Sequence, residues 1–386
     1  ANFNYIIQTI GYKPILSSQK QKIYRNSMYL SFLSVIISLN YQDPLILIIY
    51  LFLENVRCEI TESRVDKMDD TADIDIEILK ECTLCPRVCR VDRTRYIGMC
   101  TAGRLPKLSN IVLHKGEEPP LSKGMGASAV FFSGCQMKCI YCQNMGFSQR
   151  GVGFEITVEE LACAFLKTQR GSASTLDLVS PTPYLPWIIK ALDMSRKCGF
   201  NLPVVYNTSS YERVDTLRKI EGYMDIYLAD IRYTDNQMGM KYSKVPDYWD
   251  IAQKAVHEMY RQVGPFDEER MKGLIVRILV LPNNVSGHEK ALEFVANLDK
   301  DIPISLMSQY IPHFGAKEDE MINRKITKDE YESALNKLIA LDLDGWMQLD
   351  EKEKITTFGV DWRCSESDIQ KLVTEEIEER ERSFNG

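Results

Sequence analysis

The stretch Phe-Phe-Ser-Gly-Cys-Gln-Met-Lys-Cys-Ile-Tyr-Cys-Gln-Asn, residues 131–144, brings three cysteines together on one short segment. Cys135, Cys139 and Cys142 follow the spacing C-x3-C-x2-C. Three thiolates on one loop can hold three irons of a [4Fe-4S] cluster, and they leave the fourth iron without a protein ligand. A structural iron–sulfur or zinc site normally has four protein ligands. The spacing therefore favours a cluster with one open iron over the alternatives, a zinc knuckle or unconnected thiols.

Four further cysteines lie upstream, with the spacing C-x2-C-x3-C-x10-C: Cys82, Cys85, Cys89 and Cys100. Four thiolates can close a tetrahedral zinc site or hold a second four-iron cluster. The spacing predicts a metal site and leaves both identities open, an electron relay or structural zinc. C-x-x-C pairs of this kind are typical of metal ligands more than of a disulfide framework. Free thiolates need a reducing compartment, so we expect a cytoplasmic protein.

The chain downstream of residue 127 alternates short apolar runs with amphipathic stretches, which is the pattern of βα units around a parallel sheet. The predicted strands are residues 129–132, 176–179, 203–206, 226–228, 274–280 and 304–307. The predicted helices are residues 158–169, 186–198, 212–220, 249–263, 289–298 and 326–341. The cysteine loop follows the first of these strands, where the ligands of parallel α/β folds bind.

Polar side chains also follow later strands. Asn207 ends one strand, and Asp230 ends the next. Arg277 stands inside an otherwise apolar strand and needs a partner, either Asp230 or the carboxylate of a bound ligand. His114, close to Glu117 and Glu118, is either a pocket residue or a structural histidine. These side chains are candidates for a site at the carboxyl ends of the strands.

The residues around the three cysteines resemble the radical S-adenosylmethionine (radical SAM) superfamily. Tyr141 before Cys142, and the trailing Cys-Gln-Asn, resemble its activating-enzyme branch. The resemblance is strongest to a group of uncharacterised iron–sulfur proteins homologous to pyruvate formate-lyase activating enzyme, and it covers about residues 82–348. The matching pieces are Cys-Thr-Leu-Cys-Pro-Arg-Val-Cys-Arg-Val-Asp-Arg (82–93), Val-Phe-Phe-Ser-Gly-Cys (130–135), Val-Val-Tyr-Asn-Thr-Ser (204–209), Asp-Ile-Tyr-Leu-Ala-Asp (225–230), Glu-Met-Tyr-Arg-Gln-Val-Gly (258–264) and Leu-Met-Ser-Gln-Tyr (306–310).

This resemblance implies an α/β fold, a partial (β/α)6 radical SAM barrel with a small N-terminal cysteine-rich metal-binding segment. It implies reductive cleavage of SAM at a [4Fe-4S] cluster to give a 5′-deoxyadenosyl radical, with a flavodoxin- or ferredoxin-like protein as external electron donor. A glycyl-radical enzyme is one target that it suggests. Fold and cofactor do not fix the substrate. A small molecule or another protein side chain is the alternative target, and a non-catalytic iron–sulfur or zinc scaffold is the other class.

The resemblance also assigns roles to individual residues. Ser180 and Thr182 stand where the superfamily carries a Gly-Gly-Glu stretch that receives the amine of SAM, so they are candidates to replace it; the alternative is that the prolines around them only shape a turn. Asp230 and Arg232 resemble an Asp-x-Lys motif, and Arg232 can bind a carboxylate through two hydrogen bonds. The group usually has two histidines where this chain has Pro183 and Ile278, which puts its turnover in question.

The rest of the chain gives broader expectations. The net charge is −7 and no basic stripe stands out, so nucleic acid is not predicted as a ligand. The longest uninterrupted apolar run, residues 45–53, is far short of the roughly 20 residues that span a bilayer. We expect four parts: an atypical extension at 1–70 (a gene-model artefact, a disordered segment or a membrane-surface anchor), the metal-binding segment with its four cysteines at 71–125, the barrel at 126–348, and a charged tail at 349–386 that forms a solvated helix or a frayed end.

Overall fold

The computed structural model describes residues 76–347 and the backbone of residues 357–359. The predicted extension at 1–70 and almost all of the tail at 349–386 lie outside the described residues. Ten strands of the described part form one sheet in the order β10-β1-β2-β4-β5-β6-β7-β8-β9, with β3 paired to β1. Their bounds are β1 Lys107–His114, β2 Ala127–Phe132, β3 Phe154–Glu155, β4 Leu176–Val179, β5 Val204–Thr208, β6 Ile226–Asp230, β7 Gly273–Leu279, β8 Ile304–Met307, β9 Gly345–Met347 and β10 Thr357–Gly359.

The parallel part of the sheet runs from β2 through β4, β5, β6, β7 and β8 to β9. Its first six strands are the six predicted ones, and the predicted α/β fold with a partial (β/α)6 barrel is confirmed. β1 pairs antiparallel with β2, β3 and β10. The prediction of a helix or frayed end after residue 349 is wrong for residues 357–359, because their backbone continues the sheet beyond β1.

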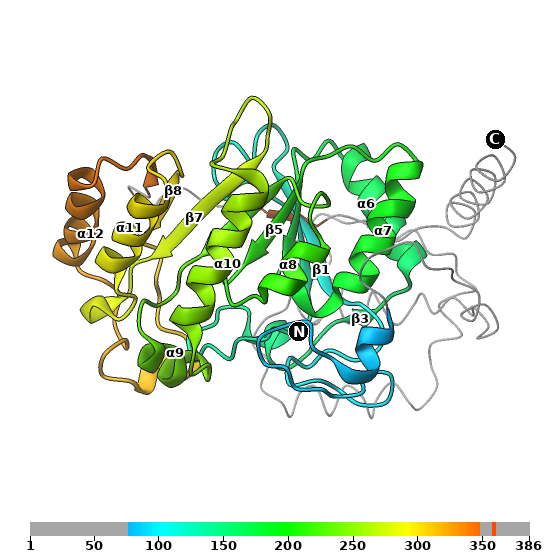
Figure 1. Ribbon diagram of the computed structural model, residues 1–386, viewed down its shortest axis with the longest axis horizontal. Helices are drawn as coiled ribbons and strands as arrows, with labels where there is room; N and C mark the ends of the chain where they lie inside the picture. The colour runs from blue at the N-terminus through cyan, green and yellow to red at the C-terminus, as the bar shows by residue number, and fades with distance from the viewer. Residues whose placement is uncertain (1–75, 348–356, 360–386) are drawn as a thin grey trace, which may run out of the picture. The chain divides into compact units, whose positions relative to one another are not determined.

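The helices that connect the parallel strands agree with the predicted ones within a few residues, except for the helix at 236–243, which was not predicted. In Figure 1 most of them lie along the sheet, whereas α9 (Asn236–Ser243) lies below α10 (Tyr248–Val263) in that view. Capping boxes begin two of them, at Thr157 with Glu160 and at Thr327 with Glu330. The helix bounds are α5 Met145–Ser148, α6 Val158–Arg170, α7 Leu185–Lys197, α8 Val214–Lys219, α9 Asn236–Ser243, α10 Tyr248–Val263, α11 His288–Leu298 and α12 Lys328–Ala340, with 3-10 turns at Ile76–Glu81, Thr182–Tyr184, Pro282–Asn284 and Phe314–Glu318.

The side chains on the inner face of the parallel sheet change from apolar to polar along its strands. A small apolar cluster, separate from the main core, contains Val205 of β5, Leu228 of β6 and Ile275 of β7. Side chains two residues apart on a strand share one face. The next inward positions are therefore Asn207, Asp230 and Arg277. The inside of the barrel is apolar at one level and polar at the next level toward the strand ends.

Residues 115–126, which connect β1 to β2, form the floor segment of the barrel. Leu121 of this segment also belongs to the small apolar cluster inside the barrel and is 1% exposed. Thr175 donates a hydrogen bond from Oγ1 to the Leu121 carbonyl at 3.0 Å, which ties the segment to the beginning of β4. The floor segment also carries Glu117 and Glu118 to the polar level above the cluster.

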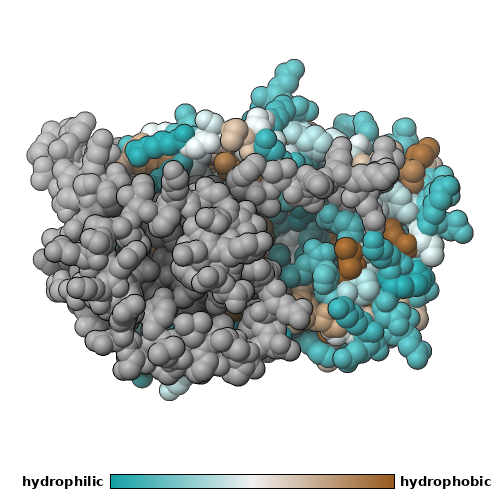
Figure 2. Space-filling view, turned by 180° about the vertical axis from the view of Figure 1, so that it is seen from behind, coloured by the Kyte–Doolittle hydropathy of each residue, from teal (hydrophilic) through white to brown (hydrophobic). Residues whose placement is uncertain are grey.

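Among the helices of the described residues, none is long and apolar enough to cross a membrane. Figure 2 shows the described part of one face as mostly hydrophilic, with hydrophobic side chains in small separate areas.

Candidate functional site

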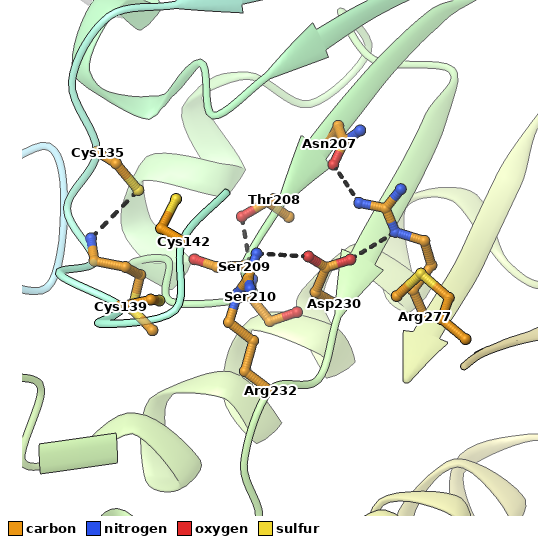
Figure 3. Close-up of polar contacts among 12 residues, drawn as sticks. Cys135, Cys139, Cys142, Asn207, Thr208, Ser209, Ser210, Asp230, Arg232 and Arg277 are labelled. Carbon is orange, nitrogen blue, oxygen red and sulfur yellow. Dashed lines mark hydrogen bonds and ion pairs between the residues drawn. The ribbon is translucent and has the colours of Figure 1, made fainter. Parts of the chain in front are cut away.

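A cavity of about 210 Å³ is lined by the cysteine loop and by strand ends of the inner face. Cys135, Cys139 and Cys142 lie at one end, and Asn207 and Arg277 lie at the other, as Figure 3 shows. The structure thus brings together eight of the residues predicted for the SAM and cluster site: Cys135, Cys139, Cys142, Ser180, Asn207, Asp230, Arg232 and Arg277.

Thr182 is the predicted cofactor residue that does not line the cavity. It is fully buried, and its Oγ1 donates to Oε1 of Glu212 at 2.6 Å. The 3-10 turn Thr182–Tyr184 directs this side chain into the protein behind the cysteine loop. Thr182 thus contacts Glu212 and Gln136 of the cysteine loop in this structure, and its predicted contact with SAM stays a prediction.

The conformation of the cysteine loop depends on Gly134. Its φ is +97°, and a Cβ there would lie 2.5 Å from the carbonyl oxygen of Cys100. The close approach permits a hydrogen bond from the Cys135 amide to that same oxygen, at 3.0 Å. Glycine is needed at this position because any other side chain meets both strain and a clash.

Hydrogen-bond donors surround the three thiols. The Met137 amide donates to Cys135 Sγ at 3.4 Å, the Ser243 hydroxyl donates to Cys139 Sγ at 3.0 Å, and Ser148 Oγ lies 3.3 Å from Cys142 Sγ. Donors of this kind stabilise a thiolate and tune a metal that it binds. Three thiols that face one cavity and are supplied with donors form a ligand set that fits a cluster with one open iron.

Burial sets the protonation of these thiols in the free protein. It raises the pKa of Cys135 to about 12, and the neighbouring Cys139 adds to this effect. Burial also raises the pKa of Cys139, while the positive charge of Arg232 opposes it. Metal binding requires deprotonated thiols, so metal loading must displace protons here. No three His, Cys, Asp or Glu side chains within the described residues are arranged to hold a single metal ion.

A chain of ion pairs crosses the other end of the cavity. Asp230 accepts from Arg232 Nη2 at 2.8 Å and from Arg277 Nε at 2.6 Å. Arg277 also donates from Nη2 to Asn207 Oδ1 at 2.6 Å and from Nη1 to Glu117 Oε2 at 3.2 Å. The carboxylates hold the pKa of Arg277 above its usual range, although burial opposes them. Of the two partners predicted for Arg277, the structure provides Asp230.

Two buried acids at this site were not predicted from the sequence. Asp177 of β4 is 1% exposed and accepts from Asn207 Nδ2 at 3.1 Å. Glu212 is 1% exposed, and burial raises its pKa to about 7. It accepts from Thr208 Oγ1 at 2.7 Å and from Nε2 of Gln136, inside the cysteine loop, at 3.0 Å. The sequence does contain a signal for each of them. Asp177 is a single acid within a predicted buried strand, and Glu212 follows the polar residues at the end of another strand.

The second cysteine set lies directly beside the first. Cys100 supplies the carbonyl that accepts from Cys135, and Cys85 is close enough to Cys100 that their charges repel. Burial, more than this repulsion, raises the pKa of Cys85 far above its usual value. Arg93 is buried, lies 3.7 Å from Cys82 Sγ through Nη1, and donates to the Pro183 carbonyl at 2.6 Å. It thereby fastens the cysteine-rich segment to the barrel.

Comparison with known proteins places the chain in a family. No family model matches it. The chain is 34% identical over 290 residues to MJ0674 of Methanocaldococcus jannaschii, a protein described as uncharacterized, and the match covers 72% of this chain and 80% of the relative. The chain belongs to the family of MJ0674.

Several solved structures are also similar to this member of the MJ0674 family, at lower sequence identity than MJ0674 itself. One is a domain of pyruvate-formate lyase-activating enzyme from Bacteroides vulgatus, at 17% identity and a TM-score of 0.31, covering 42% of this chain and 90% of that one. SuiB of Streptococcus suis bound to S-adenosylmethionine matches at 12% identity and a TM-score of 0.41, covering 56% and 48%. A radical SAM methyltransferase from Sphaerobacter thermophilus matches at 10% identity and a TM-score of 0.38, covering 58% and 67%. These likenesses concern the fold alone, and membership of the radical SAM superfamily stays a prediction from the cysteine motif.

Proposed function

We propose that this protein is an enzyme that binds a [4Fe-4S] cluster through Cys135, Cys139 and Cys142 and cleaves SAM reductively. The observation that carries the proposal is one cavity lined both by these three thiols and by the polar ends of β5, β6 and β7. When bound, the cluster and SAM would supply one-electron chemistry that yields a 5′-deoxyadenosyl radical, and the protein's share is binding, orientation and exclusion of water.

Arg232 is the residue best placed to hold the carboxylate of SAM. It lines the cavity, lies close enough to Cys139 to oppose the rise in the pKa of that thiol, and is oriented by Asp230. Its buried Nε has no hydrogen-bond partner among the described residues. A buried guanidinium N–H without a partner is costly, and a carboxylate would satisfy it. Ser180, which also lines the cavity, is then the candidate for the methionyl amine.

The apolar wall and the loop support have separate roles. Phe131 and Val179 line the cavity and exclude water from it. Glu212, by accepting from both Gln136 and Thr182, holds the cysteine loop from behind. Asn207, Asp230 and Arg277 restrain one another, so they shape the far end of the cavity.

For the second cysteine set we propose a second iron–sulfur cluster that relays electrons from an external one-electron donor, with structural zinc as the alternative. The support is the hydrogen bond between Cys135 and Cys100, which brings the two sets into direct contact. Metal analysis of a Cys135→Ala, Cys139→Ala, Cys142→Ala variant distinguishes them. A relay leaves about four irons per chain, and structural zinc leaves one zinc and no iron.

The target of the radical is a finer part of the proposal. The resemblance to activating enzymes supports the glycine backbone of a partner glycyl-radical enzyme. A small molecule or another protein side chain is the alternative, since a shared fold and cofactor do not carry a substrate with them.

The proposal is tested by anaerobic reconstitution of the cluster, reduction with dithionite and an assay for 5′-deoxyadenosine. We expect 5′-deoxyadenosine from the wild type and from Cys198→Ala, a cysteine outside both sets, and none from Cys135→Ala. If the wild-type protein has an intact cluster but produces no 5′-deoxyadenosine, the proposed enzymatic function is wrong. The alternative of a non-catalytic iron–sulfur scaffold then remains.

A further inference from the structure

The second cysteine set reaches the first one through the side chain of Arg87. This arginine stands inside the turn Cys-Pro-Arg-Val-Cys, residues 85–89, between two cysteines of the second set. It donates from Nε to the Gln136 carbonyl at 3.0 Å, from Nη1 to the Lys244 carbonyl at 2.5 Å and from Nη2 to the Ser243 carbonyl at 3.4 Å. One side chain of the second set therefore holds both the middle of the cysteine loop and the end of α9.

The cysteine loop rests on the carboxyl-terminal end of α9. The Ser243 hydroxyl donates to Cys139 Sγ at 3.0 Å. The Lys138 amide donates to the Ser243 carbonyl at 3.0 Å, and the Ile140 amide donates to the Tyr242 carbonyl at 2.9 Å. The last carbonyls of a helix have no partner inside the helix, and a cation near them is favourable. The guanidinium from the second set supplies that cation, so it belongs to the contact that places the thiols.

The backbone that presents Arg87 is strained. Val88 has a φ of +41°, and Arg90 has a φ of +53°. A β-branched residue at a positive φ is an outlier, and such a conformation persists only where the surroundings hold it in place. Backbone hydrogen bonds close the turn: the Val88 amide donates to the Cys85 carbonyl at 3.1 Å, and the Arg90 amide donates to the Cys82 carbonyl at 3.0 Å. A metal bound by the thiols on both sides of the turn would hold it further.

The four thiols of the second set lie within electrostatic range of one another. Burial raises the pKa of Cys100, and the charges of Cys82 and Cys89 raise it further. Burial also raises the pKa of Cys85, and the charge of Cys100 adds to this effect. The set therefore gathers thiols from both sides of Arg87. A metal that these thiols bind would join the two ends of the strained turn and fix the position of the guanidinium.

We propose that Arg87 is a positioning residue that makes SAM binding depend on the metal occupancy of the second cysteine set. With a metal bound, the turn at 85–89 is fixed and the guanidinium holds the cysteine loop against α9. Without the metal, the strained turn relaxes and the loop loses this support. The cluster then shifts relative to Arg232 and Ser180, and a displacement of about 1 Å weakens a preorganised site. The inference rests on the proposed function, and it is the same for zinc and for a second cluster.

The test is a double-mutant cycle on SAM affinity, measured by isothermal titration of the anaerobically reconstituted protein without reductant. Arg87→Met removes the guanidinium and keeps an apolar stem. A second-set variant carries both Cys85→Ala and Cys89→Ala, and metal analysis checks that its second set is empty. We expect each change to weaken SAM binding about ten-fold. Their combination should bind SAM no more weakly than either alone, because both break one connection, whereas independent effects would multiply to about a hundred-fold.

Two further variants and the binding stoichiometry separate positioning from stability. Arg87→Lys keeps the charge but not the planar fork, so its SAM affinity should fall between those of the wild type and Arg87→Met. Arg90→Met breaks only the exposed pair with Glu81 and should bind SAM like the wild type. A variant that merely loses folded or loaded protein binds less SAM per chain with an unchanged Kd. Thermal unfolding and iron analysis measure the folded and loaded fractions.

The inference is wrong if Arg87→Met or the second-set variant keeps the wild-type Kd for SAM, or if their effects multiply. If the second-set variant does not fold, Cys85→Ser with Cys89→Ser takes its place. A second set that cannot be emptied without unfolding also overturns the inference, because occupancy would then control folding and not the position of the loop. Failure of the proposed function gives a different result, since SAM binding stays measurable even if the wild type forms no 5′-deoxyadenosine.

Discussion

The two ends of the cavity are built in different ways. At the thiol end, three ligands come from eight consecutive residues, Cys135 to Cys142, and neighbours such as Ser148 and Ser243 only refine them. At the far end, Glu117, Asp177, Asn207, Asp230 and Arg277 come from the floor segment and four strands. The thiol end is a local motif that the fold orients, whereas the far end exists only after the barrel has closed. The two ends should therefore respond differently to mutation.

The largest effect should come from removing a ligand at the thiol end. Cys139→Ala leaves two thiols for a cluster that needs three, so iron content from this set and 5′-deoxyadenosine formation should both fall to background. Iron analysis and the 5′-deoxyadenosine assay measure this. Cys198→Ala should behave like the wild type. Retention of the cluster in Cys139→Ala would show that another side chain replaces the ligand.

The far end should respond through folding stability. Arg277→Leu leaves Asp230 and Glu117 buried without their common partner, and breaking a buried pair in this way costs about 3–5 kcal/mol. Urea unfolding of the reconstituted protein measures the loss. Arg270→Leu breaks the exposed pair with Asp267 and should cost about 0–1 kcal/mol. Equal losses in the two variants would contradict the structural role of Arg277.

Glu212, which holds the cysteine loop from behind, should make the folding stability depend on pH. Burial raises the pKa of Glu212 from 4.5 in the unfolded chain to about 7 in the folded one. The folded state therefore binds the proton more tightly, and this contribution is present below pH 4.5 and is lost as the pH rises through 7. The loss amounts to about 3 kcal/mol.

Urea midpoints between pH 5 and 8 check this for the wild type and for Glu212→Gln, which keeps the acceptor but cannot ionise. The slope over this range should be smaller in the variant. An unchanged slope would assign the pH dependence to other buried acids, such as Asp177.

The smallest expected effect tests how tightly the two cysteine sets are joined. Gly134→Ala places a Cβ 2.5 Å from the Cys100 carbonyl at a φ of +97°, and a strained backbone of this kind costs about 1–3 kcal/mol. Thermal unfolding and iron content should both fall. Gly146→Ala, where a Cβ would meet nothing within 4 Å, is the control and should change neither. Full iron content in Gly134→Ala would mean that the two sets move independently.

Prediction from the sequence succeeded for the βα units because each of their segments shows a regular pattern of apolar residues over its whole length. β4 and β8 begin and end at the predicted residues, and α6 and α10 differ by one residue at one end. It failed for β1, β9 and α9. The burial of β1 alternates irregularly, β9 has three residues, and α9 contains Gly239 in a polar stretch. Such elements form because their neighbours pair with them, not because of their own periodicity.

Among the site residues, the sequence by itself determined the seven clustered cysteines, since ligands on one loop need only local spacing. It also identified Asn207, Asp230, Arg232 and Arg277, because polar side chains at the ends of apolar strands are conspicuous. Only the tertiary structure decided how they are used. It turned Thr182 away from the cavity, paired Arg277 with Asp230, and brought Asp177 and the two glutamates of the floor segment to one place. The physical reason is that a spacing of a few residues fixes which side chains lie close together along the chain, whereas contacts between strands depend on register and closure of the sheet.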